Sequence, residues 1–214
     1  MFITFEGIEG CGKTTQAKRL VDRLTDLEIP AILTLEPGGT RICQDIRNIL
    51  LNTKNKALSP LAELLLYAAD RAQHVGEMIT PALSQGKWVV CDRFFDATVA
   101  YQGYARGQDI HLIRTLNEKA CSGIRPDMTV LVDCPVEVGL ERALKRNKIL
   151  GQEEQARFEK EKTEFHEAVR RGYLSIAEEE PDRFVVVDGT LTINDLEIEI
   201  FEHIRPNISN DRGF

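Results

Sequence analysis

Short runs of apolar, often β-branched residues alternate along this chain with longer stretches in which apolar residues recur every three or four positions. The first such stretch carries Ala17, Leu20 and Leu24 at helical spacing. Apolar runs separated by helices are typical of a parallel sheet that is covered on both faces. The predicted strands are residues 2–5, 31–35, 88–91, 129–132 and 184–187.

Two long segments interrupt this alternation. Residues 36–86 separate the second and third predicted strands and look largely helical, whereas residues 142–180, between the fourth and fifth, are rich in charge. A chain of 214 residues can form one sizeable core but is too short for two full domains. We therefore predict a single α/β domain over residues 1–206, with a five-stranded parallel sheet, helices on both faces and a tail at 207–214.

A helix predicted within residues 61–83 carries two stripes of different chemistry. The apolar stripe is expected to face the core. The second stripe places Tyr67 one turn before Arg71, so that a ring could stack on a planar base while the cation meets an oxygen; a solvated helix edge explains the same spacing. The apolar stripe is Leu61, Leu64, Leu65, Ala68, Ala72, Val75 and Ile79, and the second stripe continues with His74 and Met78.

Composition narrows the class of protein. Hydrophobic residues make up 43% and charged residues 29% of the chain, as in ordinary globular proteins. The net charge of −7 disfavours a broad electrostatic grip on nucleic acid or on an anionic membrane, and no apolar stretch approaches the length that spans a bilayer. The five cysteines lack metal-site or disulfide-framework spacing, which favours reduced thiols and a cytoplasmic protein.

A phosphate-binding loop stands directly after the first predicted strand. The segment reads G-I-E-G-C-G-K-T, which matches G-x-x-x-x-G-K-[ST] and is followed by a helical pattern. In such loops the backbone N–H groups surround a polyphosphate, the lysine reaches the β- and γ-phosphates, and the last hydroxyl takes a Mg²⁺ position, here Thr14. We expect the nucleotide to be bound by Gly7, Ile8, Glu9, Gly10, Cys11, Gly12, Lys13, Thr14 and Thr15.

Acidic residues follow the third and fourth predicted strands, where ligands of open parallel sheets bind. Asp92 and Asp133 each match the acid that holds Mg²⁺ through water in phosphate-loop enzymes. Arg93 favours Asp92, because an arginine at that place can clamp a phosphate, although the two could also form a surface ion pair. Asp133 could instead cap a helix that begins near Pro135.

Glu36 follows the second predicted strand, in the segment E-P-G-G-T. This segment is typical of a turn that leads into a helix, with Thr40 as its cap. The two glycines would also let a ligand approach the backbone closely.

Four cations gather within seven residues of this acidic chain: Arg142, Lys145, Arg146 and Lys148. At helical spacing they could form a basic lid, at about residues 142–157, that closes over polyphosphate and excludes water. A solvated charged helix face explains them equally well from spacing alone.

With these motifs in order along nearly the whole chain, the sequence resembles the bacterial thymidylate kinases. The shared segments are G-I-E-G-C-G-K-T-T at 7–15, E-P-G-G-T at 36–40, L-L-L-Y-A-A-D-R at 64–71, D-R-F at 92–94, A-Y-Q-G at 100–103 and V-V-D-G-T at 186–190. The resemblance implies a P-loop NTPase fold, phosphotransfer from ATP with Mg²⁺ to the phosphate of dTMP, and a homodimer. Another nucleoside-monophosphate or small-metabolite kinase on the same scaffold is the alternative.

The resemblance also implies roles for single residues. Lys13 holds the ATP phosphates and Arg93 holds the dTMP phosphate. Tyr67 would stack on thymine and Arg71 would contact a carbonyl oxygen of the base. Asp92 would bind Mg²⁺ through water.

Around the sugar and the base edge, the resemblance assigns four more positions. Tyr101 would crowd C2′ and disfavour ribose, while Glu9 would lie near the 3′-hydroxyl and the metal. Thr98 would lie near the base edge, and Glu36 and Gln102 would face the acceptor pocket.

Members of this family differ in whether a catalytic arginine lies in the phosphate loop or in the lid. The loop of this chain has no arginine, so the resemblance nominates Arg142 and Arg146 as catalytic cations. The usual Arg-Gly-Glu-Leu-Asp-Arg lid sequence is replaced here, and which cation reaches the transferred phosphoryl group stays open.

Overall fold

The computed structural model describes residues 1–151, 154 and 156–211, apart from the side chains of 209–211. Its centre is a sheet of five parallel strands in the order β2-β3-β1-β4-β5, which confirms the predicted α/β architecture. Each strand lies where the apolar runs predict it, and four of them continue onto a terminal acidic residue. The strands are β1 (Phe2–Glu6), β2 (Ala31–Leu35), β3 (Trp88–Asp92), β4 (Met128–Asp133) and β5 (Phe184–Asp188).

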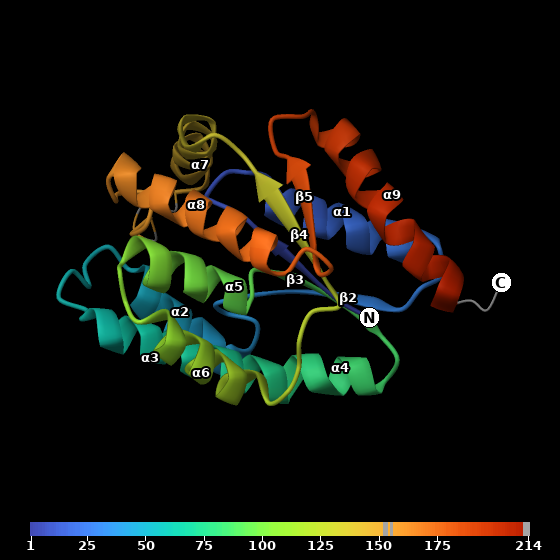
Figure 1. Ribbon diagram of the computed structural model, residues 1–214, viewed down its shortest axis with the longest axis horizontal. Helices are drawn as coiled ribbons and strands as arrows, with labels where there is room; N and C mark the ends of the chain where they lie inside the picture. The colour runs from blue at the N-terminus through green and yellow to red at the C-terminus, as the bar shows by residue number, and fades with distance from the viewer. Residues whose placement is uncertain (152–153, 155, 212–214) are drawn as a thin grey trace.

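Helices cover both faces of the sheet. Figure 1 shows α1 and α9 together on one side and α5 and α8 on the other. The helical elements are α1 (Lys13–Asp26), α2 (Arg41–Leu51), α3 (Pro60–His74), η1 (Val75–Ile79), α4 (Thr80–Ser84), α5 (Phe95–Thr98), η2 (Val99–Ala105), α6 (Ile110–Cys121), α7 (Val136–Leu150), α8 (Thr163–Glu179) and α9 (Ile193–Asp211), where η1 and η2 are π-helical turns. None of the helices in the described part of the chain is long and apolar enough to cross a membrane.

Local signals in the sequence begin several of these helices. The Thr40 side chain accepts a hydrogen bond from the Cys43 N–H and caps α2, as predicted. Ser59 caps α3 in the same way, with Pro60 in the first turn. These caps place α2 and α3 as a pair after β2, which brings both helices to the carboxyl edge of the sheet.

The core is formed by both faces of the central strands. All residues of β1 are buried, and Ala17, Leu20 and Leu24 of α1 pack against this sheet. The five cysteines are all buried and unpaired, which agrees with the reduced thiols expected from their spacing.

The orientation of α3 differs from the prediction. Leu64 is fully buried, but Leu61 and Leu65 of the apolar stripe are about half exposed. The polar stripe turns inward instead, because Arg71 and His74 both bind the buried carboxylate of Glu36. The spacing of hydrophobic residues in α3 could not show that a buried carboxylate from another segment would bind its polar side.

The predicted tail is also different. Helix α9 continues past Pro206 to Asp211, so residues 207–211 of the expected tail are helical. Ile204 and Ile208 are buried in the core on either side of this proline, which stabilises the last turns of the helix. Residues 212–214 lie outside the described part of the chain.

Candidate functional site

The phosphate loop joins β1 to α1 in a conformation that requires glycine. Gly7, Gly10 and Gly12 have φ of 140°, 71° and 108°. A side chain at Gly10 would collide with α7, because its Cβ would lie 2.0 Å from the carbonyl oxygen of Gly139. Lys13 begins α1 with 7% of its surface exposed, and its Nζ donates to the backbone oxygen of Ile8 at 3.0 Å.

A cavity of about 890 Å³ opens at the carboxyl edge of the sheet, beside this loop. Gly7 and Ile8 form the buried start of the loop and do not appear among the described residues that line the cavity. The other sequence-predicted site residues all line it: Glu9, Gly10, Cys11, Gly12, Lys13, Thr14, Thr15, Glu36, Tyr67, Arg71, Asp92, Arg93, Thr98, Tyr101, Gln102, Arg142 and Arg146.

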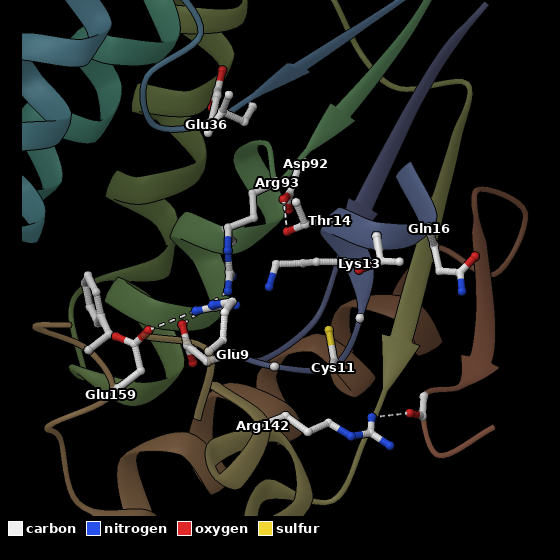
Figure 2. Close-up of a pocket in the computed structure, with 18 of the residues that line it drawn as sticks. Glu9, Cys11, Lys13, Thr14, Gln16, Glu36, Asp92, Arg93, Arg142 and Glu159 are labelled. Carbon is white, nitrogen blue, oxygen red and sulfur yellow. Dashed lines mark hydrogen bonds and ion pairs between the residues drawn. The ribbon is translucent and has the colours of Figure 1, made fainter. Parts of the chain in front are cut away.

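The two candidate metal-side acids have different partners. Asp92 lies at the end of β3, where its Oδ2 accepts a hydrogen bond from the Thr14 hydroxyl (Figure 2). Its Oδ1 is buried and has no hydrogen-bond partner among the described residues. Asp133 instead binds both Nε and NH2 of Arg170 on α8, at 2.7 and 2.8 Å, and does not cap α7. The geometry thus favours Asp92 over Asp133 as the acid beside the phosphate loop.

Arg93 is held by contacts from three elements rather than by Asp92. Its NH1 donates to the Tyr173 hydroxyl at 3.0 Å and its NH2 to Glu9 Oε1 at 3.2 Å, while its guanidinium lies 4.9 Å from the centre of the Tyr101 ring. The residue adopts φ of 70°, a rare conformation outside glycine. In Figure 2 the side chain of Arg93 reaches down toward Glu9 and that of Lys13 reaches across from α1 toward the same space.

A buried acid, Glu6, is connected to Arg93 through the Tyr173 hydroxyl. Glu6, the last residue of β1, accepts hydrogen bonds from the Tyr173 hydroxyl and the Phe94 N–H, both at 2.7 Å. Burial and the nearby carboxylate of Asp96 raise the pKa of Glu6 to about 8, despite the opposing effect of Arg93. Glu6 and Tyr173 were missed by motif reasoning, since neither belongs to a segment that carries chemistry by spacing.

Glu9 remains a carboxylate although it is buried, with only 9% of its surface exposed. Burial would raise the pKa of Glu9, but His166, Arg93 and Lys13 together outweigh burial and hold this pKa well below its usual range. The Tyr101 hydroxyl donates to the same Oε1 that binds Arg93. The loop therefore presents a fixed negative charge between two cations.

Arg71 of α3, which also lines the cavity, is almost completely buried. Its Nε donates to Glu36 at 2.9 Å, its NH1 to Asn117 at 2.7 Å and its NH2 to Thr98 at 3.0 Å. This network brings together Glu36, Arg71 and Thr98, which are far apart in the sequence. Asn117 of α6 was not predicted, because a lone asparagine in an amphipathic helix carries no signal.

Tyr67 and Gln102 complete this wall. The Tyr67 ring is half-buried, and burial raises the pKa of its hydroxyl, which therefore stays protonated. The Gln102 amide donates to Glu63 at 2.7 Å, and Glu63 also accepts a hydrogen bond from Arg106 at 2.9 Å. Tyr67 and Gln102 both line the cavity, and Glu63 fixes the amide of Gln102 there.

The predicted basic cluster lies on the last turns of α7 and divides into two kinds of residue. Arg142 donates to the backbone oxygen of Gly189 at 2.8 Å and, like Arg146, lines the cavity. Arg146 NH2 donates to Asn147 at 3.0 Å and lies 3.5 Å from Glu159. Lys145 pairs with Glu141 on its own helix and is about 70% exposed, as expected for a solvated face. Residues 152, 153 and 155 of the predicted lid lie outside the described residues.

Several residues that line the cavity were not predicted from the sequence, among them Arg47 and Phe158. Arg47 of α2 is half-buried and donates to the Pro37 carbonyl at 2.6 Å; burial lowers the pKa of its guanidinium. Phe158 lies edge-on to Tyr101, with ring centres 5.4 Å apart. Arg47 is one of two arginines in α2, and nothing in its spacing distinguishes it from the exposed Arg41.

Comparison with known proteins agrees with this geometry. The family model described as thymidylate kinase matches residues 5–200. The thymidylate kinase of Geobacter sp. (strain M21) is 54% identical over 95% of this chain and 91% of its own length, and that of Desulfosudis oleivorans is 57% identical over 88% and 89%.

A solved structure is similar in both sequence and fold. The crystal structure of thymidylate kinase from Ehrlichia chaffeensis superposes with a TM-score of 0.76 at 36% identity, and the match covers 96% of this chain and 98% of that one. Since the family model and the relatives both span nearly the whole chain, the chain belongs to the thymidylate kinase family.

Proposed function

We propose that this chain transfers the γ-phosphoryl group of ATP to the phosphate of dTMP and so produces dTDP. The observation that carries this proposal is one cavity with two opposed sites for anions. The phosphate loop and Lys13 line one part of it, and Arg93 reaches into it from the end of β3; Arg47 of α2 lines the same cavity. Membership of the thymidylate kinase family supports dTMP as the acceptor.

The donor phosphates are bound by the loop. Its backbone N–H groups and the amino end of α1 attract negative charge. Lys13 adds a positive charge that is held in place by the Ile8 carbonyl. We assign ATP binding to the loop from Gly7 to Thr15.

The acceptor lies on the other side of the cavity. We assign the dTMP phosphate to Arg93, with Arg47 as a second cation, and the stacking of thymine to Tyr67. The buried network of Arg71 and Thr98 faces the base edge, and Tyr101 closes the site at the sugar.

This arrangement needs no general base. The acceptor phosphate is already an oxyanion near neutral pH, so catalysis depends on positioning and on electrostatic stabilisation of the transferred group. Lys13 and Arg93 are held by hydrogen bonds from the protein, so little reorganisation is required as charge develops. Arg142 and Arg146 on the rim of the cavity supply further positive charge.

The residues beside the loop fit a magnesium ion. Thr14 and Asp92 offer oxygen atoms, the ligands that Mg²⁺ prefers, and the buried Oδ1 of Asp92 lacks a partner among the described residues. Among the described residues, no group of three or more acidic, histidine or cysteine side chains is arranged to hold a metal ion by itself. When bound, Mg²⁺ would neutralise charge on the phosphates of ATP.

A panel of acceptors tests the proposed reaction. Purified protein with ATP and Mg²⁺ should phosphorylate dTMP at a higher kcat/KM than dUMP, dGMP, AMP or shikimate. Conversion of another acceptor with dTMP left untouched would support a different kinase on the same scaffold and would contradict this assignment.

We further propose that the protein acts as a cytoplasmic homodimer. Free, buried cysteines agree with a reducing compartment. Large apolar side chains about half exposed on the neighbouring helices α2, α3 and α6 offer a surface for a second copy. Sedimentation should show a dimer that Leu65→Glu converts to monomer; a monomeric wild type would contradict this part. These side chains are Ile42, Ile49, Leu61, Leu65 and Leu112.

A further inference from the structure

A buried histidine lies behind the phosphate loop. His166 belongs to α8 and has no exposed surface, and its Nδ1 is 3.3 Å from Oε2 of Glu9. No motif suggested this residue, which is more than 150 positions from the loop in the sequence. The Phe165 ring lies edge-on to the imidazole, with 5.5 Å between ring centres.

The two groups lack other partners. Within the part of the chain that the structure describes, neither Glu9 Oε2 nor either ring nitrogen of His166 has a well-formed hydrogen bond to any residue. Leaving buried polar atoms unpaired costs on the order of 1–3 kcal/mol each. A small closure of the 3.3 Å separation would pair Nδ1 with Oε2, and no other described group offers either atom such a contact.

His74 shows how this chain treats a buried imidazole that serves the packing of its helix. Its Nδ1 lies 2.9 Å from Glu36 and its Nε2 lies 2.6 Å from the Thr34 hydroxyl, so both nitrogens are paired. His166 differs, because neither of its nitrogens has a hydrogen-bond partner among the described residues and Glu9 supplies the one carboxylate within 4 Å of them there. The position of Nδ1 beside this carboxylate is therefore the polar contact that needs an explanation.

We propose that His166 is a positioning residue whose Nδ1–H donates a hydrogen bond to Glu9 Oε2 and fixes the loop carboxylate in the cavity. The other oxygen, Oε1, then stays on Arg93 and on the Tyr101 hydroxyl. Since the Nε2 atom has no acceptor among the described residues, the neutral ring with its proton on Nδ1 is the form that fits. His166 thereby acts on Arg93 and Tyr101 through Glu9.

Nuclear magnetic resonance of the histidine side-chain nitrogens tests the contact without substrate. His166→Phe assigns the signal among the chain's four histidines. We expect wild-type His166 to carry its proton on Nδ1 and Glu9→Gln to shift its nitrogen signals, while His74 in the same spectrum stays unchanged. A proton on Nε2 alone, or a His166 signal that ignores Glu9→Gln, would overturn the proposal.

Kinetics test the consequence and rest on the proposed function. An asparagine side chain can place an N–H near the position of Nδ1, whereas glutamine places its amide near Nε2. We expect His166→Phe and His166→Gln to lower kcat for dTMP by about 10-fold, the scale of losing a positioning contact, and His166→Asn to recover most of it.

Unfolding measurements separate positioning from stability. The loss of kcat in the three variants should not follow their free energies of unfolding, and His166→Phe should add little to the loss caused by Glu9→Gln. Equal losses in all three variants, or additive losses with Glu9→Gln, would contradict the positioning role. If dTMP proves not to be the acceptor, the spectra still decide whether His166 holds Glu9.

Discussion

Two pairs of cations border the cavity, and they differ in what holds them. Lys13 at the start of α1 and Arg93 directly after β3 have little exposed surface, and both bind acceptors elsewhere in the chain. Arg142 and Arg146 lie on α7 and are largely exposed, and Arg146 binds mainly the neighbouring Asn147 and Glu159. All four carry the same formal charge.

A cation that merely borders the cavity and one that the protein already holds in place are therefore not expected to stabilise developing negative charge equally. A cation held by the surrounding structure stabilises developing negative charge without first being ordered, and poor access of water strengthens its effect. An exposed cation is screened by solvent and must give up side-chain freedom to act. The loop side should therefore dominate catalysis and the α7 side should modulate it.

The largest effect is expected from Lys13→Ala. Removal of this buried cation should lower kcat by at least about 10²-fold, the scale for one preorganised stabiliser. Steady-state phosphorylation of dTMP measures it. Lys18→Ala, on the exposed face of the same helix, is the matched control and should leave kcat unchanged. A Lys13→Ala loss no greater than that of an α7 arginine would erase the distinction between the two pairs.

The contact between the two regions is tested by Gly10→Ala against Gly12→Ala. Both glycines have positive φ, so each substitution should cost about 1–2 kcal/mol of unfolding free energy. The added Cβ at Gly10 also meets the Gly139 carbonyl at 2.0 Å, whereas no described atom lies within 4 Å of that at Gly12. Denaturant unfolding should therefore show Gly10→Ala to be less stable than Gly12→Ala by about 2 kcal/mol. Equal stabilities would mean that the loop does not press on α7.

Glu6, directly before the phosphate loop, should make the free energy of unfolding depend on pH. Since folding raises its pKa from 4.5 to about 8, the folded chain keeps a proton that the unfolded chain releases over this range. Stability from Glu6 is therefore full below the lower value and is lost as pH rises toward 8, by up to about 1.4 kcal/mol per pH unit. Glu6→Gln should flatten this dependence in denaturant unfolding. Glu141→Gln, on the exposed face of α7, should not; the same pH profile in Glu6→Gln and wild type would refute the assignment.

The smallest effects should come from α7. Arg142→Ala should lower kcat by about 10-fold, since this side chain is anchored at the rim by the Gly189 carbonyl, and Arg146→Ala by less. Lys145→Ala is the control and should have no effect, because Lys145 pairs with Glu141 in solvent. A larger loss of kcat from Arg146→Ala than from Arg142→Ala would show that the hydrogen-bond partners of these two arginines do not predict which one stabilises the transferred group.

Much of the fold and the loop could be predicted because their signals are local. The strands were visible as apolar runs, and the Gly7–Thr14 segment carries its conformation in its own glycines and lysine. The acids after the strands could be singled out because parallel strands end at one edge. Arg93 already favoured Asp92 over Asp133 in the sequence, but the partner of Asp133, Arg170 of the distant helix α8, could not be predicted.

The amino-acid sequence by itself therefore determined the sheet, the phosphate loop and the candidate residues at the strand ends, because each depends on neighbours within about one helix turn or strand. Only the tertiary structure decided which charged side chains are buried and which residues bind them. Tyr173 meets Glu6 across 167 positions, and the polar side of α3 turns inward toward Glu36. Such contacts depend on how separate elements pack, and periodicity within one element cannot reveal its partner.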